Sequence, residues 1–343
     1  MKVMIASPLE PELAESVRSL PVVDELLYDE ALLPKPRYPN DHVGIPTALD
    51  AVAERRWDAM LGRSDVLFGY PSESSAGLAR ALECGPHVRF VQGTSAGMGA
   101  HIRRAGLDAA TLRRVRFASA AGVHAAMLAE FVFYGLLAIR KDAARLRRLR
   151  QQRTWEHFVM GELDGSRIAV VGMGQIGCAL ASRARAFGMH VVAVNRSGEA
   201  HHLADETLPT TAIADAMATC DAVVVTLPLT DRTTNLVDAA AIAAMPSHGI
   251  LVNVGRGAVV DNAALIVALQ TDRIAGAVLD VFDPEPLPAD SPLWQMSNVI
   301  LSPHTAALSA HENRRIVAVF CDNLERLASD RPLRNALNMA EFY

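Results

Sequence analysis

Residues 167–177 read RIAVVGMGQIG, and this stretch decides the fold of the chain. It begins with an apolar run that is typical of a buried strand, and a helical pattern rich in Ala, Leu and Arg follows over 175–187. Three glycines with the spacing G-x-G-x-x-G join the two patterns. At a strand-to-helix junction this spacing indicates a dinucleotide-binding βαβ unit, so the sequence predicts an α/β fold with a parallel sheet.

Each of the three glycines has its own expected role. Gly172 permits a tight turn, Gly174 lets the backbone approach a pyrophosphate, and Gly177 allows the helix to pack closely against the strand. The N-terminus of the helix then presents N–H groups and a positive dipole to the phosphates. We therefore expect a dinucleotide cofactor at residues 172–177.

Short apolar runs alternate with helical patterns on both sides of this unit, as in parallel sheets covered by helices. The predicted strands are 3–5, 66–68, 88–91 and 115–117, followed by 167–171, 190–194, 222–226, 249–254, 275–280 and 298–301. The predicted helices are 10–18, 47–56, 74–83, 122–140 with a basic continuation to 152, 175–187, 238–244, 261–270 and 306–328.

The final predicted helix is amphipathic, and we expect it to return to the N-terminal part of the chain. A length of 343 residues also favours two domains over one. The sequence thus predicts two parallel-sheet domains. One is a discontinuous, flavodoxin-like substrate domain formed by 1–120 and completed by 305–343, and the other is an inserted Rossmann dinucleotide-binding domain, 121–304.

The composition of the chain limits which binding partners and which cellular compartment are expected. A net charge of -5 gives no reason to expect nucleic acid or an anionic membrane, and the arginines of 140–153 are expected to form a solvated helix face. The apolar segment 121–139 contains His124 and Glu130, which favours a buried helix over a membrane span. The four cysteines are far apart and form no metal-type pair. We therefore expect a cytoplasmic protein without a metal site.

The end of the strand 190–194 bears on the choice of cofactor. An acidic residue there would bind the ribose 2′-hydroxyl of NAD(H), but this chain has Asn195, Arg196 and Ser197. Arg196 would attract a 2′-phosphate, and its two neighbours would add hydrogen bonds. We predict a preference for NADP(H). If Arg196 instead points to solvent, NAD(H) remains the alternative.

Three polar residues follow predicted strands in the second half of the chain. Arg256 lies in VNVGRG (252–257), Glu285 in LDVFDPEP (279–286) and His304 in SPH (302–304). Ligands of open parallel sheets bind at the carboxyl ends of the strands, so these side chains are expected to lie together. A cation, a carboxylate and an imidazole beside a nicotinamide suit hydride transfer to or from a hydroxy acid.

With these motifs in order, the chain resembles the D-isomer-specific 2-hydroxyacid dehydrogenases over nearly its whole length. The resemblance implies that Arg256 binds the substrate carboxylate and polarises the adjacent carbonyl. It implies that His304 is the acid/base and that Glu285 orients the imidazole. The Glu285-Pro286 pair argues against the formate dehydrogenases, which share the fold but have Gln-Pro at this place.

The resemblance also implies further contacts with the cofactor and the substrate. The backbone of Gln175 and Ile176 would meet the pyrophosphate, and Asp280 would accept from the nicotinamide amide, although capping of a nearby turn is its alternative role. The other implied cofactor contacts are Leu227 and Pro228 on the adenosine side, and Val254 and Arg256 at the nicotinamide ribose. The implied substrate loops contain Gly69, Tyr70, Ser95 and Gly97.

The leading hypothesis is an NADP(H)-preferring reductase of a small 2-oxo acid, such as glyoxylate, hydroxypyruvate or a bulkier relative. Two alternatives stay open: an NAD-linked biosynthetic dehydrogenase of the same family, and a dinucleotide-sensing scaffold without activity. A homodimer through the helix 122–140 is implied by the family. Met98-Gly99 and Thr305 depart from the family pattern and leave the identity of the acid open.

Overall fold

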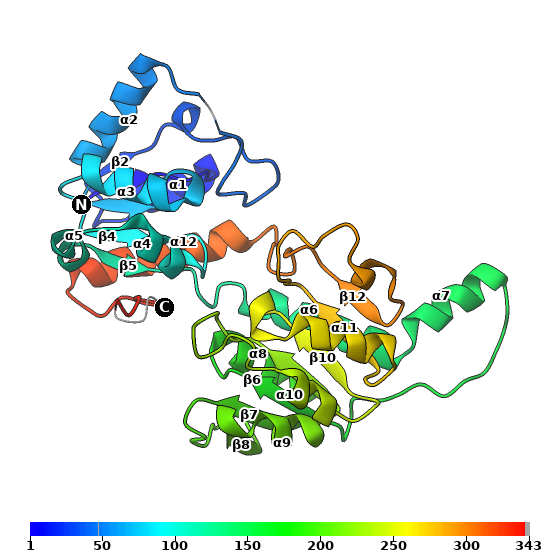
Figure 1. The fold of residues 1–343 in the computed structure, drawn as a ribbon. Coiled ribbons are helices and arrows are strands. Elements are labelled where there is room, and N and C mark those ends of the chain that lie inside the picture. Colours follow the sequence, from blue (N-terminus) through cyan, green and yellow to red (C-terminus); the bar gives the residue numbers. More distant parts are fainter. Residues whose placement is uncertain (47, 340–343) are drawn as a thin grey trace. The chain divides into compact units, whose positions relative to one another are not determined.

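The computed structural model describes residues 1–46 and 48–339 of the chain. The chain forms two compact units, and each is built around its own parallel sheet (Figure 1). The first unit consists of Met1–Val123 together with the chain from Leu308 onward, and the second consists of His124–Ala307. The predicted α/β class with two parallel sheets is confirmed.

The first unit has a five-stranded sheet in the order β2-β1-β3-β4-β5. Its strands are β1 (Lys2–Ile5), β2 (Glu25–Leu27), β3 (Val66–Phe68), β4 (Phe90–Gln92) and β5 (Arg116–Ala118). Its helices are α1 (Pro11–Arg18), α2 (Ala51–Arg63), α3 (Ser75–Cys84), α4 (Met98–Ala105), α5 (Ala109–Arg114) and α12 (Glu312–Ala328), with short 3-10 turns at Glu30–Leu32 and Pro71–Glu73. The strand order reverses between β1 and β3, which is where such sheets bind ligands.

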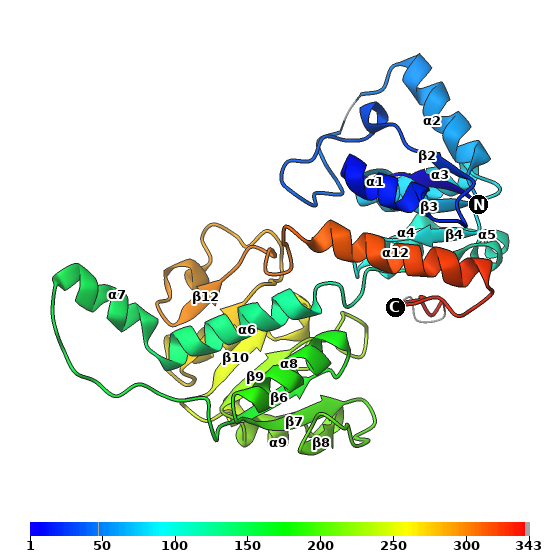
Figure 2. The same cartoon turned by 180° about the vertical axis from the view of Figure 1, so that it is seen from behind.

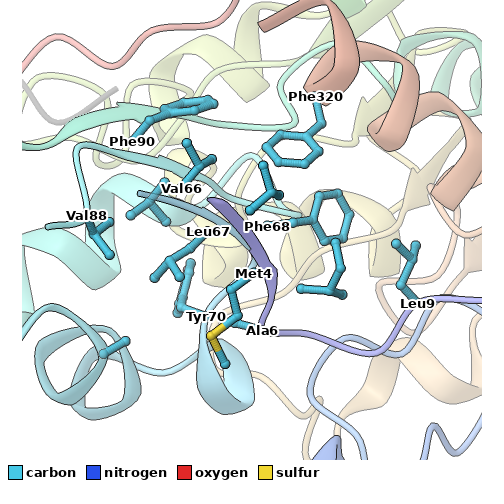
Figure 3. Packing of buried hydrophobic residues seen from close by; sticks show 14 of the residues in the cluster. Met4, Ala6, Leu9, Val66, Leu67, Phe68, Tyr70, Val88, Phe90 and Phe320 are labelled. Atoms are coloured by element: carbon cyan, nitrogen blue, oxygen red, sulfur yellow. The ribbon is translucent and has the colours of Figure 1, made fainter. Parts of the chain in front are cut away.

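The C-terminal helix α12 completes the core of this unit, as the sequence predicted. Phe320 of α12 packs against Phe68 with ring centroids 5.2 Å apart and against Phe90 at 6.2 Å. Figure 3 shows these rings together with other apolar side chains of the cluster. Because Phe68 and Phe90 belong to the central strands β3 and β4, the core depends on residues far apart in the chain.

Several predicted bounds in the first unit were wrong. The predicted helix 47–56 begins instead at Ala51, because the Asp50 side chain accepts from the N–H groups of Val52 and Ala53 and caps the helix there. Thr47 lies outside the described residues, as do 340–343 of the predicted 305–343 segment. The last helix begins at Glu312 and not at 306. The strand β2 and the helices α4 and α5 were not predicted.

The second unit has a seven-stranded sheet in the order β12-β11-β10-β9-β6-β7-β8. Its strands are β6 (Arg167–Val171), β7 (His190–Asn195), β8 (Glu206–Pro209), β9 (Ala222–Val225), β10 (Ile250–Asn253), β11 (Gly276–Leu279) and β12 (Val299–Leu301). Its helices are α6 (Ala125–Arg140), α7 (Ala143–Gln152), α8 (Gln175–Ala186), α9 (Ile213–Ala218), α10 (Ala239–Ala244) and α11 (Asn262–Gln270), with 3-10 turns at Thr210–Ala212, Gly257–Val259 and Pro292–Gln295. The predicted strand at 167–171 is confirmed, whereas β8 and α9 were missed.

Both faces of the seven-stranded sheet are covered by apolar side chains. Helices α6 and α8 lie side by side over one face (Figure 2), and α6 packs so closely that a Cβ on Gly135 would lie 2.5 Å from the Val278 side chain. In the part of the chain that the structure describes, no helix has the length and apolarity needed to cross a membrane. The apolar helix α6 instead packs its buried side on one face of the seven-stranded sheet.

Candidate active site

The carboxyl ends of β10, β11 and β12 carry the three polar residues expected to do chemistry. Glu285 and His304 are brought together: Nδ1 of His304 lies 3.0 Å from Oε2 of Glu285. The other carboxylate oxygen, Oε1, accepts from the backbone N–H of Phe282 at 2.9 Å. An ionised carboxylate can only accept, so Nδ1 carries the proton of the pair and Nε2 is left to act outward.

Arg256 lies at the same edge, and its turn is held from both sides. The buried Asn253 side chain accepts from the N–H of Gly255 and donates to the carbonyl of Arg256, each at 3.0 Å. A Cβ on Gly257 would lie 2.0 Å from the Phe282 carbonyl oxygen, so this glycine lets the Arg256 turn approach the Glu285 loop. Burial lowers the pKa of Arg256, and the Glu285 carboxylate opposes that shift. The guanidinium therefore stays charged and close to the Glu285–His304 pair.

The backbone that presents His304 has an unusual conformation. Its φ is 56°, in the left-handed region that non-glycine residues seldom adopt. Oδ1 of the buried Asp280 accepts from the N–H groups of Thr305 and Ala306, both at 3.0 Å, directly after the histidine. Asp280 therefore caps the turn that positions His304. This is the alternative role considered for it, and its expected contact with a nicotinamide amide stays a prediction.

The glycine motif has the geometry that a dinucleotide needs. Gly172 has a φ of 104°, and a Cβ there would lie 2.8 Å from Leu227 Cδ2 and from Thr226 Oγ1. A Cβ on Gly177 would lie 2.0 Å from the Gly172 carbonyl oxygen, so helix α8 needs glycine at this contact. A Cβ on Gly174, in contrast, would meet nothing within 4 Å. The open space at Gly174, at the start of α8, fits a pyrophosphate group.

The remaining expected cofactor contacts lie around this turn. The Leu227 backbone is so close to Gly255 that a Cβ there would lie 2.6 Å from the Leu227 carbonyl oxygen. Val254 extends the hydrogen bonding between β10 and β9, since its N–H donates to the Val225 carbonyl at 3.1 Å. Pro228 is exposed beside Leu227, and Gln175 and Ile176 form the first turn of α8. These residues all follow the carboxyl ends of β6, β9 and β10, and their contact with a cofactor stays a prediction.

The loop after β7 uses Asn195 for its own structure. The Asn195 side chain donates to the Glu199 carbonyl at 2.8 Å and accepts from the N–H of Gly198 at 2.6 Å. The amide oxygen and one amide N–H are therefore engaged within the loop, and the expected contact of Asn195 with a 2′-phosphate stays a prediction. Arg196 and Ser197 follow at the exposed tip of the loop and stay the candidates for that contact.

A contact not predicted from the sequence ties this loop to α8. Nε2 of His201 lies 3.7 Å from Sγ of Cys178, and the N–H of Leu203 donates to Nδ1 of the same ring at 3.3 Å. Burial raises the pKa of the Cys178 thiol, which disfavours the thiolate form. The contact between Cys178 and His201 could not be predicted from the sequence, because it depends on the conformation of the loop after β7.

The expected substrate loop after β3 needs a correction. The N–H of Gly69 donates to the Gln92 carbonyl at 2.8 Å, so Gly69 does not offer it to a carboxylate. Its φ is 68°, and a Cβ would lie 2.2 Å from Ser7 Cβ, which explains the glycine. The Tyr70 side chain is fully buried and its hydroxyl lies 2.7 Å from His101 Nδ1.

The second expected substrate loop, which contains Ser95 and Gly97, also makes structural hydrogen bonds. The Ser95 carbonyl accepts from the N–H of Ala120 at 3.2 Å, and Gly97 is the N-cap residue directly before α4. The hydroxyl of Thr94 hydrogen-bonds to Glu73, which the sequence reading overlooked. Burial raises the pKa of Glu73 to about 7, and the Glu312 carboxylate adds to this shift. This bond joins the two loops at the carboxyl edge of the sheet.

The chain is similar to known proteins of one family. The profile of the "D-isomer specific 2-hydroxyacid dehydrogenase, NAD binding domain" matches residues 133–306. A glyoxylate reductase of Korarchaeum cryptofilum is 32% identical over 255 residues, which are 72% of this chain and 75% of that protein. A glyoxylate/hydroxypyruvate reductase B of Enterobacter sp. is 39% identical over 180 residues, 52% of this chain and 55% of its own.

A solved structure shows the same likeness over the full length. It is a D-isomer specific 2-hydroxyacid dehydrogenase from Xanthobacter autotrophicus in complex with NADPH and MES. It is 26% identical, has a TM-score of 0.77, and covers 100% of this chain and 99% of its own. Fold, glycine motif and relatives together define a nicotinamide-dinucleotide-dependent oxidoreductase acting on CH–OH groups. Within that class, the chain belongs to the D-isomer specific 2-hydroxyacid dehydrogenase family.

Proposed function

We propose that this protein is an NADP(H)-preferring reductase of small 2-oxo acids, similar in reaction to the glyoxylate and hydroxypyruvate reductases. One observation carries the proposal. Glu285 and His304 form a 3.0 Å hydrogen bond at the sheet edge, and the Glu285 carboxylate interacts electrostatically with the Arg256 guanidinium there. The guanidinium suits the carboxylate of a 2-oxo acid, and the imidazole suits proton transfer to its carbonyl oxygen.

In the forward direction, Arg256 binds the substrate carboxylate and orients the adjacent carbonyl. A reduced nicotinamide dinucleotide held at the Gly172–Gly177 turn would provide the hydride for the carbonyl carbon. His304 donates a proton to the carbonyl oxygen from Nε2, while Glu285 holds Nδ1 and stabilises the charged ring before transfer. In oxidation the same imidazole accepts the proton. Asp280 keeps the histidine in its left-handed conformation throughout.

The cofactor preference rests on the tip of the β7 loop. Arg196 and Ser197 offer a cation and a hydroxyl to a 2′-phosphate, and neither residue adds a carboxylate that would repel it. The chain also carries Glu199 in this loop, and the N–H of that residue bonds to the Ser197 hydroxyl at 3.3 Å. A measured preference of kcat/KM for NADH over NADPH would remove this part of the proposal.

The same proposal gives the two units their roles, the second binding the dinucleotide and the first the substrate. It includes a homodimer formed through α6 and the segment after α7. Exposed apolar side chains on these elements favour a second copy as their cover, since Tyr134, Trp155 and Val159 are 58%, 90% and 98% exposed. It also includes a cytoplasmic location, because the four cysteines are unpaired.

A panel of 2-oxo acids tested with both cofactors is the decisive experiment. Turnover of at least one acid, faster with NADPH than with NADH, is the expected result. Binding of NADPH without turnover of any acid would contradict the proposal and favour a non-enzymatic, dinucleotide-sensing role. Turnover with a strict NADH preference would favour an NAD-linked dehydrogenase of the same family.

A further inference from the structure

The loop between β7 and β8, residues 196–205, contacts the glycine turn through two side chains that have no part in the proposed reaction. Nε2 of His201 lies 3.7 Å from Sγ of Cys178, and this Sγ lies 3.6 Å from the carbonyl oxygen of Met173. Met173 is the second residue of the glycine motif 172–177, and Cys178 directly follows that motif. The β7–β8 loop is therefore joined to the turn at which a pyrophosphate is expected.

The hydrogen bonds of these side chains have one consistent direction. The N–H of Leu203 can only donate, so Nδ1 of His201, 3.3 Å away, is its acceptor. In a neutral imidazole the proton is then on Nε2, which faces Sγ of Cys178. Burial raises the pKa of Cys178, so the thiol keeps its own proton for the Met173 carbonyl. An uncharged chain of donors and acceptors thus runs from the loop to the glycine turn.

The other contacts of the β7–β8 loop hold it at different places. Its tip is closed by bonds within the loop itself. At its base, Asp205 and the β7 residue Val191 exchange two backbone-anchored hydrogen bonds of 2.9 Å, and Arg185 near the end of α8 pairs with the Asp205 carboxylate at 2.7 Å. The His201–Cys178 contact is instead made at the first turn of α8, beside the glycine motif.

A dinucleotide that carries a 2′-phosphate would meet both of these elements at once. In the proposed function its pyrophosphate lies at the glycine turn, and its 2′-phosphate meets Arg196 and Ser197 at the loop tip. The covalent structure of the dinucleotide limits the separation of these two groups. A loop that is already held against α8 therefore binds such a ligand at a smaller ordering cost than a free loop does.

We propose that His201 is a positioning residue, which holds the β7–β8 loop against the first turn of α8 through Cys178. In this position Arg196 and Ser197 are placed for the 2′-phosphate of NADP(H). This inference rests on the NADP(H) preference proposed above and extends it to two residues that act through the loop. NADH has no 2′-phosphate, so its binding depends little on His201.

The first test measures the Kd of NADPH and of NADH by fluorescence titration of His201→Ala. We expect the Kd and KM for NADPH to rise about fivefold, within the range for one lost hydrogen bond, with kcat at saturating NADPH and the Kd for NADH nearly unchanged. His202→Ala is the matched control, because the exposed His202 stacks on His201 but makes none of the hydrogen bonds described above. Equal changes for the two cofactors, or in the two variants, overturn the proposal.

Two further variants separate the two bonds of the imidazole. In His201→Gln the new amide N–H reaches about as far as Nε2 and can donate to Cys178. In His201→Asn the new amide oxygen replaces Nδ1 and keeps only the bond from the Leu203 N–H, as in an Asx turn. We expect His201→Gln to retain NADPH binding and His201→Asn to lose it as His201→Ala does. The opposite order would show that the imidazole only closes its local turn, and it overturns the proposal.

Cys178→Ala tests the other side of the contact. It should weaken NADPH binding as much as His201→Ala does, and the double variant should be no weaker than either single variant, because all three lack the same contact. Losses that multiply in the double variant would show two independent effects and overturn the proposal. Far-UV circular dichroism and the Tm identify the folded variants, and the His201 variants decide the question if Cys178→Ala does not fold.

The unaltered protein separates this inference from the proposed function. Tighter binding of NADPH than of NADH is expected. Tighter binding of NADH would remove the proposed cofactor preference and the role of His201 with it. A preference for NADPH that is the same in the unaltered protein and in His201→Ala would remove the role of His201 alone. Binding is measured without turnover, so this test holds whichever 2-oxo acid is reduced.

Discussion

The two units use the carboxyl edge of a parallel sheet in different ways. In the second unit the edge carries charged side chains, and Glu285 and His304 meet there beside Arg256. In the first unit the corresponding edge carries a backbone loop with positive φ values, and its tyrosine points into the core. In the proposed function, the second unit supplies proton transfer and charge, whereas the first supplies shape. Substitutions in the two edges should fail in different ways, and this difference can be measured.

The largest effect is expected for His304→Ala. Loss of the imidazole removes the proton donor and should lower kcat by about 10²–10⁴-fold, the usual contribution of a general acid. Binding of NADPH should be nearly unchanged, because the glycine motif is untouched. Steady-state kinetics and NADPH fluorescence titration measure the two effects. An unaltered kcat in this variant would refute the role of His304.

Arg256→Lys should have the next largest effect. A lysine keeps the charge but loses the two parallel N–H donors that suit a carboxylate. The expected result is a rise of about ten- to a hundredfold in KM for the 2-oxo acid, since a hydrogen bond to a charged group contributes about 1.5–3 kcal/mol. Arg273→Lys, an exposed arginine of the same unit, is the control. A KM unchanged by Arg256→Lys would assign the carboxylate to another group.

Gly69→Ala tests the backbone role of the first unit. The new Cβ would lie 2.2 Å from Ser7 Cβ at a φ of 68°, so the free energy of unfolding should fall by about 3 kcal/mol. Gly106→Ala is the matched control, because its φ is 65° and a Cβ there meets nothing within 4 Å. It should cost about 1 kcal/mol, the conformational part alone. Equal urea midpoints for the two variants would show that the contact with Ser7 is unimportant.

The effect of Glu73→Gln on stability depends on pH. Burial raises the pKa of Glu73 from 4.5 to about 7, so the folded protein binds this proton more tightly than the unfolded chain. The resulting stability is present below pH 4.5 and is lost as the pH rises to about 7. Relative to the unaltered protein, Glu73→Gln should therefore gain stability between pH 5 and pH 8.

Urea unfolding at several pH values measures this change. Glu83→Gln, an exposed glutamate of α3, is the control and should show no such gain. A pH-independent difference between Glu73→Gln and the unaltered protein would mean that Glu73 does not titrate in this range. It would also weaken the view that the first unit's edge is a buried, shape-forming site.

The contrast between the units also explains what the sequence could predict. The glycine motif and the residues Arg256, Glu285 and His304 were found because each lies within a few residues of an apolar strand, and a parallel sheet brings strand ends together. The hydrogen bonds of the neighbouring residues Asn195 and Gly69 were not predicted. Asn195 closes its own loop and Gly69 donates to Gln92, and both depend on loop geometry that no local pattern records.

The missed elements have a similar cause. The strands β2 and β8 are three and four residues long and carry Glu25 and Glu206, so they lack the apolar runs of the central strands. The start of α12 was misjudged because the apolar residues of 306–308 continue the helical pattern, while the chain there forms turns after the Asp280 cap. Apolar periodicity predicts helices and strands well but places their ends poorly.

The packing of Phe320 against Phe68 and Phe90 has a consequence for biosynthesis. During translation the second unit emerges from the ribosome whole, whereas the first unit waits with an open sheet face until α12 has been made. The first part of the chain to be synthesised is therefore the last to acquire its final core, and its exposed β3 and β4 need protection in the interval. Limited proteolysis of stalled nascent chains ending before Glu312 should accordingly cleave the first unit and spare the second.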